Sequence, residues 1–205
     1  MDQDTLRPDP TAISLPRLPP ELWLQICEQL DDVEFLWCAV RLISKDFKAF
    51  VDRVFASSLI PSIFCSLSLP RLDPKTGHAR YMRPVPGAEI TLQCQDPKVD
   101  SPIATFKTPT VLRSGESVAE LTASGALSKQ RLVEAEVWMW FGRQRGKGAN
   151  IATEKDLRWD EEGKVWLWSV QWEGLVDRYF NAKRAFRRTQ RRVVKEDSLT
   201  LRLRR

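Results

Sequence analysis

The sequence predicts an α+β protein in which three short helices precede a small β-rich domain that a C-terminal helix closes. Apolar residues recur at helical spacing over residues 19–56, several segments after Pro61 alternate apolar with polar residues, and helical spacing returns from Leu175 to about Arg192. The chain has 205 residues, of which 42% are hydrophobic and 29% charged. That length and composition fit a small module plus one compact domain.

The first predicted helix lies in the segment "LPRLPPELWLQICEQL", residues 15–30. Leu22, Ile26 and Leu30 are spaced four residues apart and would form one apolar stripe. Pro20 suits the first turn of a helix, where its missing N–H costs no hydrogen bond. Glu21 is favoured at the positive end of the helix dipole. The sequence therefore predicts that the helical pattern begins at Pro19, with Pro20 in the first turn.

Two further helices are expected before residue 56. Asp31 or Asp32 can cap the second helix and Ser44 can cap the third, because short polar side chains accept hydrogen bonds from unpaired N–H groups. Helices of this length are unstable alone in water. We therefore expect the three to pack on each other or on a partner.

The β-rich region is predicted from alternation of apolar and polar residues. The candidate strands are "IFCSLSL", "EITLQC", "IATFKTP", "RLVEAEVWMWFG" and "KVWLWSVQW". Between them lie the turn-forming segment "RLDPKTGHARYMRPVPGA" and the Gly-bearing loop "RQRGKGAN". No unit of 20–50 residues repeats, which argues against leucine-rich repeats and WD-type propellers.

Tryptophan is concentrated in this region, and its role has two interpretations. The six residues are Trp138, Trp140, Trp159, Trp166, Trp168 and Trp172. Alternation places Trp138 and Trp140 on one strand face, and Trp166, Trp168 and Trp172 on one face of another strand. They can form the core of the sheet under the last helix, which is the usual outcome, or an exposed aromatic binding face.

Residues 18–55 resemble an F-box. The resemblance is carried by "LPPEL" at residues 18–22, by Ile26 and Leu30, and by "VRLISKDFKAFVDRVF", in which Ile43, Lys45 and Phe47 occupy the third-helix positions of the motif. The residue pattern of these segments is similar to that of F-box proteins of filamentous fungi. The resemblance covers about a fifth of the chain.

The resemblance implies a non-catalytic subunit of a ubiquitin ligase. In the family, the F-box binds the Skp adaptor and through it a cullin, and the region after it selects a client protein. An exposed apolar helical surface is consistent with such a partner, and a proline-locked entry reduces the entropy lost on docking. The expected adaptor-contacting residues are Leu18, Pro19, Leu22, Ile26, Leu30, Val40, Ile43 and Phe47; the alternative is that some of them only hold the helices together.

The sequence gives little support for a catalytic, metal-binding or phosphate-binding site. His78, the single histidine, has no neighbouring nucleophile, and the four cysteines Cys27, Cys38, Cys65 and Cys94 lack metal-ligand spacing. "GRQRGKG" departs from the phosphate-loop pattern and fits a hairpin connection, and the acidic "DLRWDEEGK" fits a solvated turn rather than a calcium loop. We expect no cofactor, no metal, no membrane association and a cytoplasmic or nuclear protein with reduced cysteines.

The positive charge is concentrated at the C-terminus. The net charge is +5, but residues 183–205 carry +8 and residues 1–182 carry −3. This basic segment is expected to be a solvated helix face, although nucleic acid or a phosphorylated client could bind it. The alternative function is therefore nucleic-acid binding through this segment, although we expect no nucleic-acid partner. A third possibility is an F-box protein that binds the adaptor outside a ligase.

The predicted organisation is a flexible lead at 1–17, an F-box at 18–58, the β-rich domain with its helix at 59–192 and a basic tail at 193–205.

Overall fold

The computed structural model describes residues 18–69, 89–95, 101–142 and 148–203, with side chains described as far as Gln190 in the last helix. Two compact units are present, one up to Val51 and one from Asp52 onward. The predicted lead at 1–17, the turn segment with His78 and the middle of "GRQRGKG" lie outside the described residues. The β-rich domain and the closing helix belong to the second unit.

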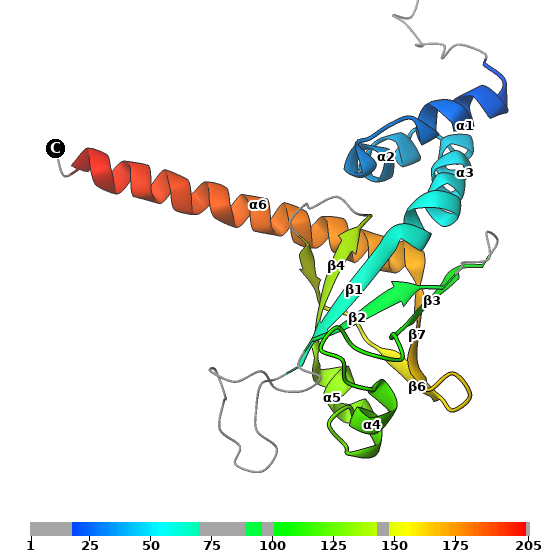
Figure 1. Cartoon of the computed structure of the whole chain (residues 1–205). Coiled ribbons are helices and arrows are strands. Elements are labelled where there is room, and N and C mark those ends of the chain that lie inside the picture. The colour runs from blue at the N-terminus through cyan, green and yellow to red at the C-terminus, as the bar shows by residue number, and fades with distance from the viewer. Residues whose placement is uncertain (1–17, 70–88, 96–100, 143–147, 204–205) are drawn as a thin grey trace, which may run out of the picture. The chain divides into compact units, whose positions relative to one another are not determined.

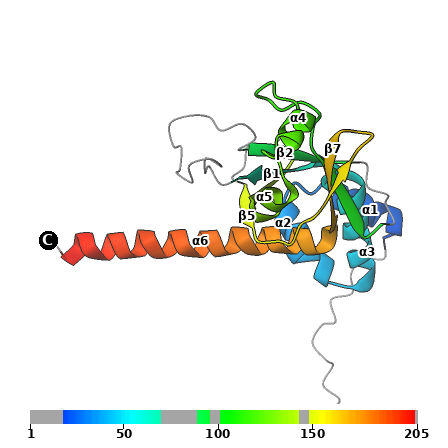
Figure 2. The ribbon, with the colours of Figure 1, turned by 90° about the horizontal axis from the view of Figure 1, so that it is seen from below.

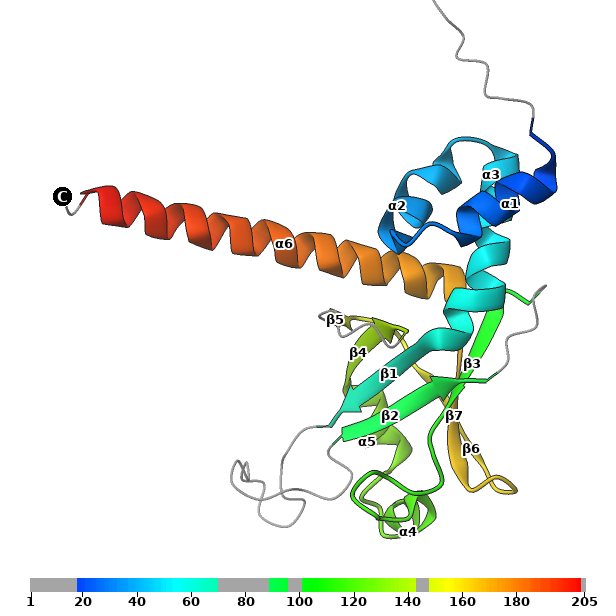
Figure 3. The ribbon, with the colours of Figure 1, turned by 45° about the horizontal axis from the view of Figure 1, so that its top comes forward.

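The first unit consists of the three predicted helices and one additional short turn (Figure 3). A 3₁₀ turn, η1, separates the second helix from the third. The third helix crosses the boundary at Val51 and is followed by a π-helical turn, η2, and a 3₁₀ turn, η3, which lead into the first strand. The bounds are α1 Pro20–Glu28, α2 Val33–Cys38, η1 Val40–Leu42, α3 Lys45–Val54, η2 Phe55–Leu59 and η3 Ile60–Ser62.

The second unit is built on one antiparallel sheet of seven strands in the order β5-β4-β1-β2-β3-β7-β6 (Figure 1). The first strand of the chain lies inside the sheet, between β2 and β4. The last strand, β7, also lies inside, between β3 and β6. The bounds are β1 Ile63–Ser68, β2 Glu89–Cys94, β3 Ile103–Lys107, β4 Glu136–Phe141, β5 Ala149–Ile151, β6 Asp156–Asp160 and β7 Val165–Gln171.

The sheet must curve because its two outer strands are consecutive in the chain. β5 ends at Ile151 and β6 begins at Asp156. The connection between them can span at most roughly 18 Å, since an extended residue spans about 3.3–3.6 Å. A flat sheet would place its outer strands farther apart, because neighbouring strands are about 4.8 Å apart. The sheet is accordingly wrapped into an open barrel with an inner and an outer face (Figure 1).

The inner face carries the apolar core of the second unit. Alternate residues of the central strands are almost completely buried, including Cys65, Leu67, Ile90, Leu92 and Met139. The rings of Phe106 and Trp168 pack with their centroids 5.4 Å apart. Because fully burying one large apolar side chain is worth about 1.5–3 kcal/mol, this face supplies most of the stability of the unit.

The last helix, α6 (Trp172–Leu203), covers part of the inner face with its first turns only. Tyr179 and Phe180 place their rings 4.9 Å and 5.8 Å from the ring of Phe141 on β4. Within the part of α6 whose side chains are described, up to Gln190, the buried residues end at Phe180, and residues 184–190 are exposed. Figures 1 and 2 both show the helix continuing past the sheet. The predicted closing helix is therefore confirmed, and it begins earlier and runs farther than predicted.

Two short helices that the sequence did not predict cover another part of the core. They are α4 (Val118–Ala123) and α5 (Lys129–Glu134), and they bury Val118, Leu121 and Leu132. The indole N–H of Trp166 on β7 donates to Thr122 Oγ1 of α4 over 3.1 Å, which fixes this helix to the sheet.

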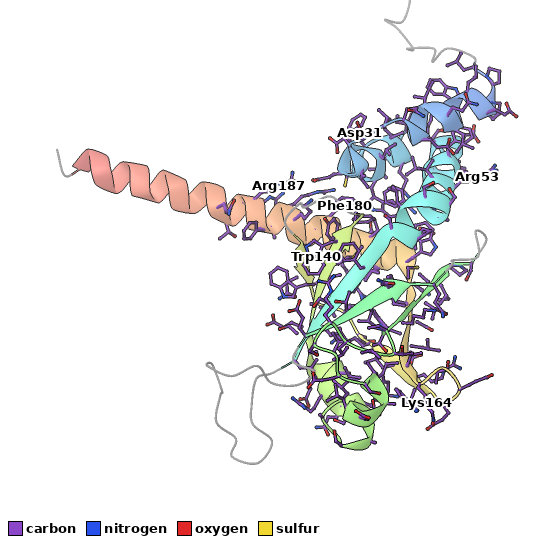
Figure 4. The ribbon with its side chains drawn as sticks, in the orientation of Figure 1. Asp31, Arg53, Trp140, Lys164, Phe180 and Arg187 are labelled. Atoms are coloured by element: carbon purple, nitrogen blue, oxygen red, sulfur yellow. The ribbon has the colours of Figure 1, made fainter. Side chains whose placement is uncertain are left out.

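Three predicted details of the β-rich region were wrong. The first part of "RLVEAEVWMWFG" forms α5 instead of a strand, because Ser128 Oγ accepts from the Arg131 N–H and starts a helix. Trp172 is the first residue of α6 and not part of the strand; it is buried like Trp166 and Trp168, and its indole N–H donates to the Ser101 carbonyl over 3.1 Å. The start of "DLRWDEEGK" is strand β6, and only the following residues form the predicted turn, where Lys164 lies (Figure 4).

Candidate functional site

The prolines at the start of the first helix have the role that the sequence predicts. Pro19 is the N-cap residue with φ −54° and ψ 147°, and Pro20 is the first residue of α1. The Pro19 carbonyl accepts from the N–H groups of Leu22 and Trp23 over 3.1 Å and 3.3 Å. Because both pyrrolidine rings fix φ, the chain enters the helix in a nearly predetermined direction.

Side-chain caps start the other two helices. Asp32 Oδ1 accepts from the Phe35 N–H over 2.9 Å, so Asp32 and not Asp31 caps α2. Ser44 Oγ accepts from the Phe47 N–H over 3.3 Å, as predicted for the third helix. Each cap satisfies an N–H that has no partner within its helix.

A small aromatic and aliphatic interior holds the three helices of the first unit. The ring of Trp23 on α1 meets the ring of Phe47 on α3 edge to face, with centroids 5.0 Å apart. Phe47 also contacts the ring of Phe50 at 6.0 Å. The guanidinium carbon of Arg41 lies 3.9 Å above the ring of Trp37, which is the geometry of a cation–π interaction.

The expected adaptor-contacting residues divide into two groups in the structure. Val40 and Phe47 are buried, so in this structure they pack within the protein, and Leu30 is half-buried. The other five are at the surface. Leu22 and Ile26 each keep 42% of their surface exposed and lie four residues apart on the same face of α1. The exposed residues are Leu18, Pro19, Leu22, Ile26 and Ile43.

Two further exposed apolar residues were not among the predicted contacts. Phe35 is 50% exposed at the start of α2, and Leu42 is 76% exposed at the end of η1. The apolar pattern could not separate Phe35 from the buried Leu36, because a helix of six residues is too short to define one face. Leu42 could only have been found by predicting η1.

Exposed apolar side chains of this size are unusual at this density in one small unit. Single exposed leucines are normal on protein surfaces, but a group of them indicates a surface that a partner covers. The surface defined by Leu18, Leu22, Ile26, Phe35, Leu42 and Ile43 is called the apolar F surface below.

The cysteines and possible metal ligands were the remaining candidates for a site. Burial, with a smaller contribution from the charge of Glu28, raises the pKa of the Cys27 thiol, which therefore stays protonated. All four cysteines of the chain are thiols. Among the described residues, no group of three or more His, Cys, Asp or Glu side chains could hold a metal ion. In the same part of the chain, no helix is both long and apolar enough to span a membrane.

Residues 15–55 match the family model of the F-box domain. The chain contains an F-box domain. The match begins before the proline entry and ends at Phe55, just after α3, so it includes every residue of the apolar F surface. F-box domains bind the Skp adaptor in SCF complexes, in which the F-box protein is usually the subunit that recognises the substrate. No curated protein and no solved structure matches the chain.

Proposed function

We propose that this F-box protein is the substrate-recognition subunit of an SCF-type (Skp–cullin–F-box) ubiquitin ligase of the fungal type. The apolar F surface binds the Skp adaptor, and the adaptor connects the chain to a cullin. The second unit holds a client protein, and the ubiquitin-transferring chemistry takes place on other subunits. The chain itself has no catalytic role and acts in the cytoplasm or the nucleus.

The observation that carries this proposal is the position of exposed apolar side chains within the matched F-box domain. Leu22 and Ile26 present two aliphatic side chains side by side on a helix whose start is fixed by Pro19 and Pro20. Ile43 adds a β-branched side chain that is 53% exposed. Covering such side chains on association gives a favourable free energy of about 25 cal/mol for each Å² of apolar surface.

The test is co-purification of the full chain with the Skp adaptor, using two matched double variants of α1. Leu22→Asp/Ile26→Asp places two charges on the apolar F surface. Gln25→Asp/Gln29→Asp places the same charges at exposed polar positions with the same spacing, one of them at the helix C-cap. We expect the first variant to weaken the complex by about 100-fold or more, because two desolvated carboxylates replace two buried aliphatic side chains.

The control variant should bind the adaptor nearly as well as the unchanged chain. Circular dichroism of both variants verifies that the helices persist. If the unchanged chain is folded and does not bind the adaptor, the proposed function is wrong. Equal loss in both variants would mean that charge on α1, and not removal of the apolar side chains, disrupts the complex, and unchanged binding of both would place the adaptor contact elsewhere on the domain. A complex that forms but does not include the cullin would favour an F-box protein that works outside a ligase.

Nucleic-acid binding is the second candidate function, and one observation favours it. Arg184, Arg187 and Arg188 are exposed on α6 beyond its buried turns (Arg187 in Figure 4). Arginines along one helix can neutralise several phosphates, and the affinity then falls steeply with salt concentration. Binding of a random DNA duplex at 50 mM and 200 mM salt, before and after removal of residues 184–205, tests this candidate.

A further inference from the structure

A row of aromatic rings lies on the outer face of the sheet, on β1 and β4. Phe64 is directly opposite Trp140, and their rings stack with centroids 6.0 Å apart and an interplanar angle of 19°. The ring of Trp138, two residues earlier on β4, stacks on Trp140 at 6.5 Å and 28°. Trp138 is 38% exposed, while Phe64 and Trp140 are half-buried. These three residues form the aromatic row (Trp140 in Figure 4).

The position of the row is fixed by a close approach to the backbone of Gly148. A Cβ atom at residue 148 would lie 2.4 Å from Cε2 of Trp140, so the indole lies directly on the backbone just before β5. Stacking on one side and backbone contact on the other leave this ring little freedom. A rigid platform loses little conformational entropy when a ligand binds.

Two carboxylates lie beside the aromatic row on the same face. In the register of the sheet, Glu136 on β4 and Glu89 on β2 are both directly opposite Ser68 of β1. Glu136 Oε2 accepts from Asn150 Nδ2 over 3.2 Å, and Glu89 Oε1 accepts from Ser66 Oγ over 3.1 Å. Both glutamates are exposed, and both of these contacts are with neutral groups. The negative charge beside Trp138 is therefore not neutralised by these neighbours.

The combination of stacked rings and two carboxylates is selective for one class of side chain. The faces of Trp and Phe rings are electron-rich and attract cations, with Trp giving the strongest interaction. A guanidinium group can lie flat on an exposed indole and donate hydrogen bonds to a carboxylate at the same time. An acidic side chain would be repelled by the carboxylates, and a neutral one would lack the cation–π attraction.

We propose that this outer face, formed by the aromatic row with Glu89 and Glu136, binds an arginine-bearing basic segment of the client protein. The inference rests on the proposed function for the identity of its partner, because a client is what the second unit would hold. The two glutamates give the described part of this face a charge opposite to that of such a segment, and the exposed Trp138 lies two residues after Glu136 on the same side of β4. Extended backbone of the client would cross β4 and β1 with an arginine on Trp138.

The test uses the full chain and a defined probe. The probe is a capped nonapeptide that repeats Gly-Ser-Arg three times, and its control has Glu in place of each Arg. Binding is measured by calorimetry and by the shifts of the indole N–H signals of Trp138 and Trp140 in a two-dimensional NMR spectrum. We expect the arginine peptide to bind and to shift both signals, and the glutamate peptide to do neither.

Matched variants test whether the peptide binds at this face or is only attracted by negative charge elsewhere on the protein. We expect Trp138→Ala to weaken binding more than threefold, and Ile103→Ala, which removes an exposed apolar side chain from β3, to leave it unchanged. We also expect Glu89→Gln/Glu136→Gln to weaken binding more than threefold, and Glu120→Gln/Glu154→Gln, at exposed positions elsewhere, to have a smaller effect. Failure of the unchanged chain to bind the arginine peptide, or equal effects of a variant and its control, overturns the inference.

The failure of this inference and the failure of the proposed function give different results. Trp138→Ala removes a ring from the outer face of the sheet and should leave co-purification with the Skp adaptor intact. Leu22→Asp/Ile26→Asp should abolish that co-purification and leave peptide binding intact. A chain that binds the adaptor but not the peptide would retain the proposed function and lose the client site. A chain that binds the peptide but not the adaptor would retain the peptide-binding face and lose the proposed function.

Discussion

At the scale of single residues, Gly148 is the position where one added carbon should matter most. Ala at 148 would put its Cβ 2.4 Å from the Trp140 ring, so that the ring or the backbone before β5 must move. Overpacking of this kind costs about 1–3 kcal/mol. We expect Gly148→Ala to lower the free energy of unfolding by that amount, as measured by urea denaturation.

Gly174 provides the matched control for this change. It lies in the first turn of α6, and no atom lies within 4 Å of a Cβ placed there. Gly174→Ala should leave the stability unchanged or raise it by up to about 1 kcal/mol, because alanine is the better helix former. If Gly148→Ala is as stable as Gly174→Ala, the contact between Gly148 and Trp140 is not a tight one.

The buried thiol of Cys65 predicts a dependence of stability on pH. Burial in the inner face, and to a lesser degree the charge of Cys94, raises the pKa of Cys65 far above the 9.0 of a solvated thiol. Above pH 9.0 the unfolded chain therefore releases a proton that the folded chain retains. The contribution of Cys65 to the free energy of unfolding is fully present below pH 9.0 and is lost as the pH rises.

Comparison with Cys65→Ala isolates this contribution from all other titrating groups. The variant should be less stable at pH 7.5, since it leaves a cavity in the core. Between pH 9 and pH 10.5 the difference in unfolding free energy should shrink by roughly 1 kcal/mol for each pH unit. A difference that stays constant over this range would contradict the burial of the thiol in the native state.

At the scale of elements, the cap of α2 should determine whether this short helix is ordered. Asp32→Ala removes the acceptor of the 2.9 Å hydrogen bond from the Phe35 N–H. Loss of such a cap costs about 0.5–2 kcal/mol, which is large for six residues. We expect faster amide hydrogen exchange in Val33–Cys38, detected by mass spectrometry.

Asp31→Ala removes the same charge from the preceding residue, labelled in Figure 4, which is not the N-cap of α2. Its exchange rates in α2 should stay close to those of the unchanged chain. Similar acceleration in both variants would mean that charge near the helix start, and not the cap hydrogen bond, stabilises α2.

The elements that the sequence predicted are those with a clear physical signature. Strands β2 and β3 alternate cleanly, because one face of each is buried against the core and the other is not; β1 follows the same pattern except that Ser66 is also buried. The helix starts at Pro20, Val33 and Lys45 were predicted from the chemistry of the preceding residues, namely proline, aspartate and serine. These signals are local and therefore readable in the sequence.

The elements that were missed depend on contacts far along the chain. The residues of α5 also fit a strand pattern, and the helix is favoured by the Ser128 cap together with the burial of Leu132 against the sheet. Strand β6 was hidden by the acidic residues of its turn, although Leu157 is buried. The six tryptophans also divide in a way that spacing could not show: Trp166 and Trp168 belong to the core, while Trp138 is exposed.

The apolar F surface was predicted only in part, for a related reason. Resemblance to the F-box identified the segment, and helical spacing identified Leu22 and Ile26. Burial of Val40 and Phe47 depends on how the helices pack, which spacing alone does not determine. Adaptor contact by any of the eight residues stays a prediction until the α1 variants are measured.

At the scale of the whole molecule, the buried part of α6 should be essential to the second unit and the rest of the helix dispensable for its stability. The core-facing residues of α6 are Trp172, Leu175, Val176, Tyr179 and Phe180. We expect a chain truncated after Gln190 to unfold within about 1 kcal/mol of the full chain, since surface changes are usually small. Tyr179→Ala should cost about 3 kcal/mol or more, because it leaves a cavity beside Phe141.

Urea denaturation of the truncated chain and of Tyr179→Ala measures both effects. A matched surface variant, Arg188→Ala, changes an exposed residue of the same helix and should behave like the full chain. A large loss of stability on truncation would show that residues 191–205 contribute contacts to the fold.

The strand order also has a consequence for synthesis on the ribosome. β7 is the last strand to be made, yet it belongs between β3 and β6. Until Val165–Gln171 has left the exit tunnel, β3 and β6 each lack a neighbour, and the ring of Phe106 has no Trp168 to cover it. The F-box helices, by contrast, are complete after about a quarter of the chain. A message broken or halted before codon 165 would therefore yield a product with an intact F-box segment and an unfinished, aggregation-prone sheet.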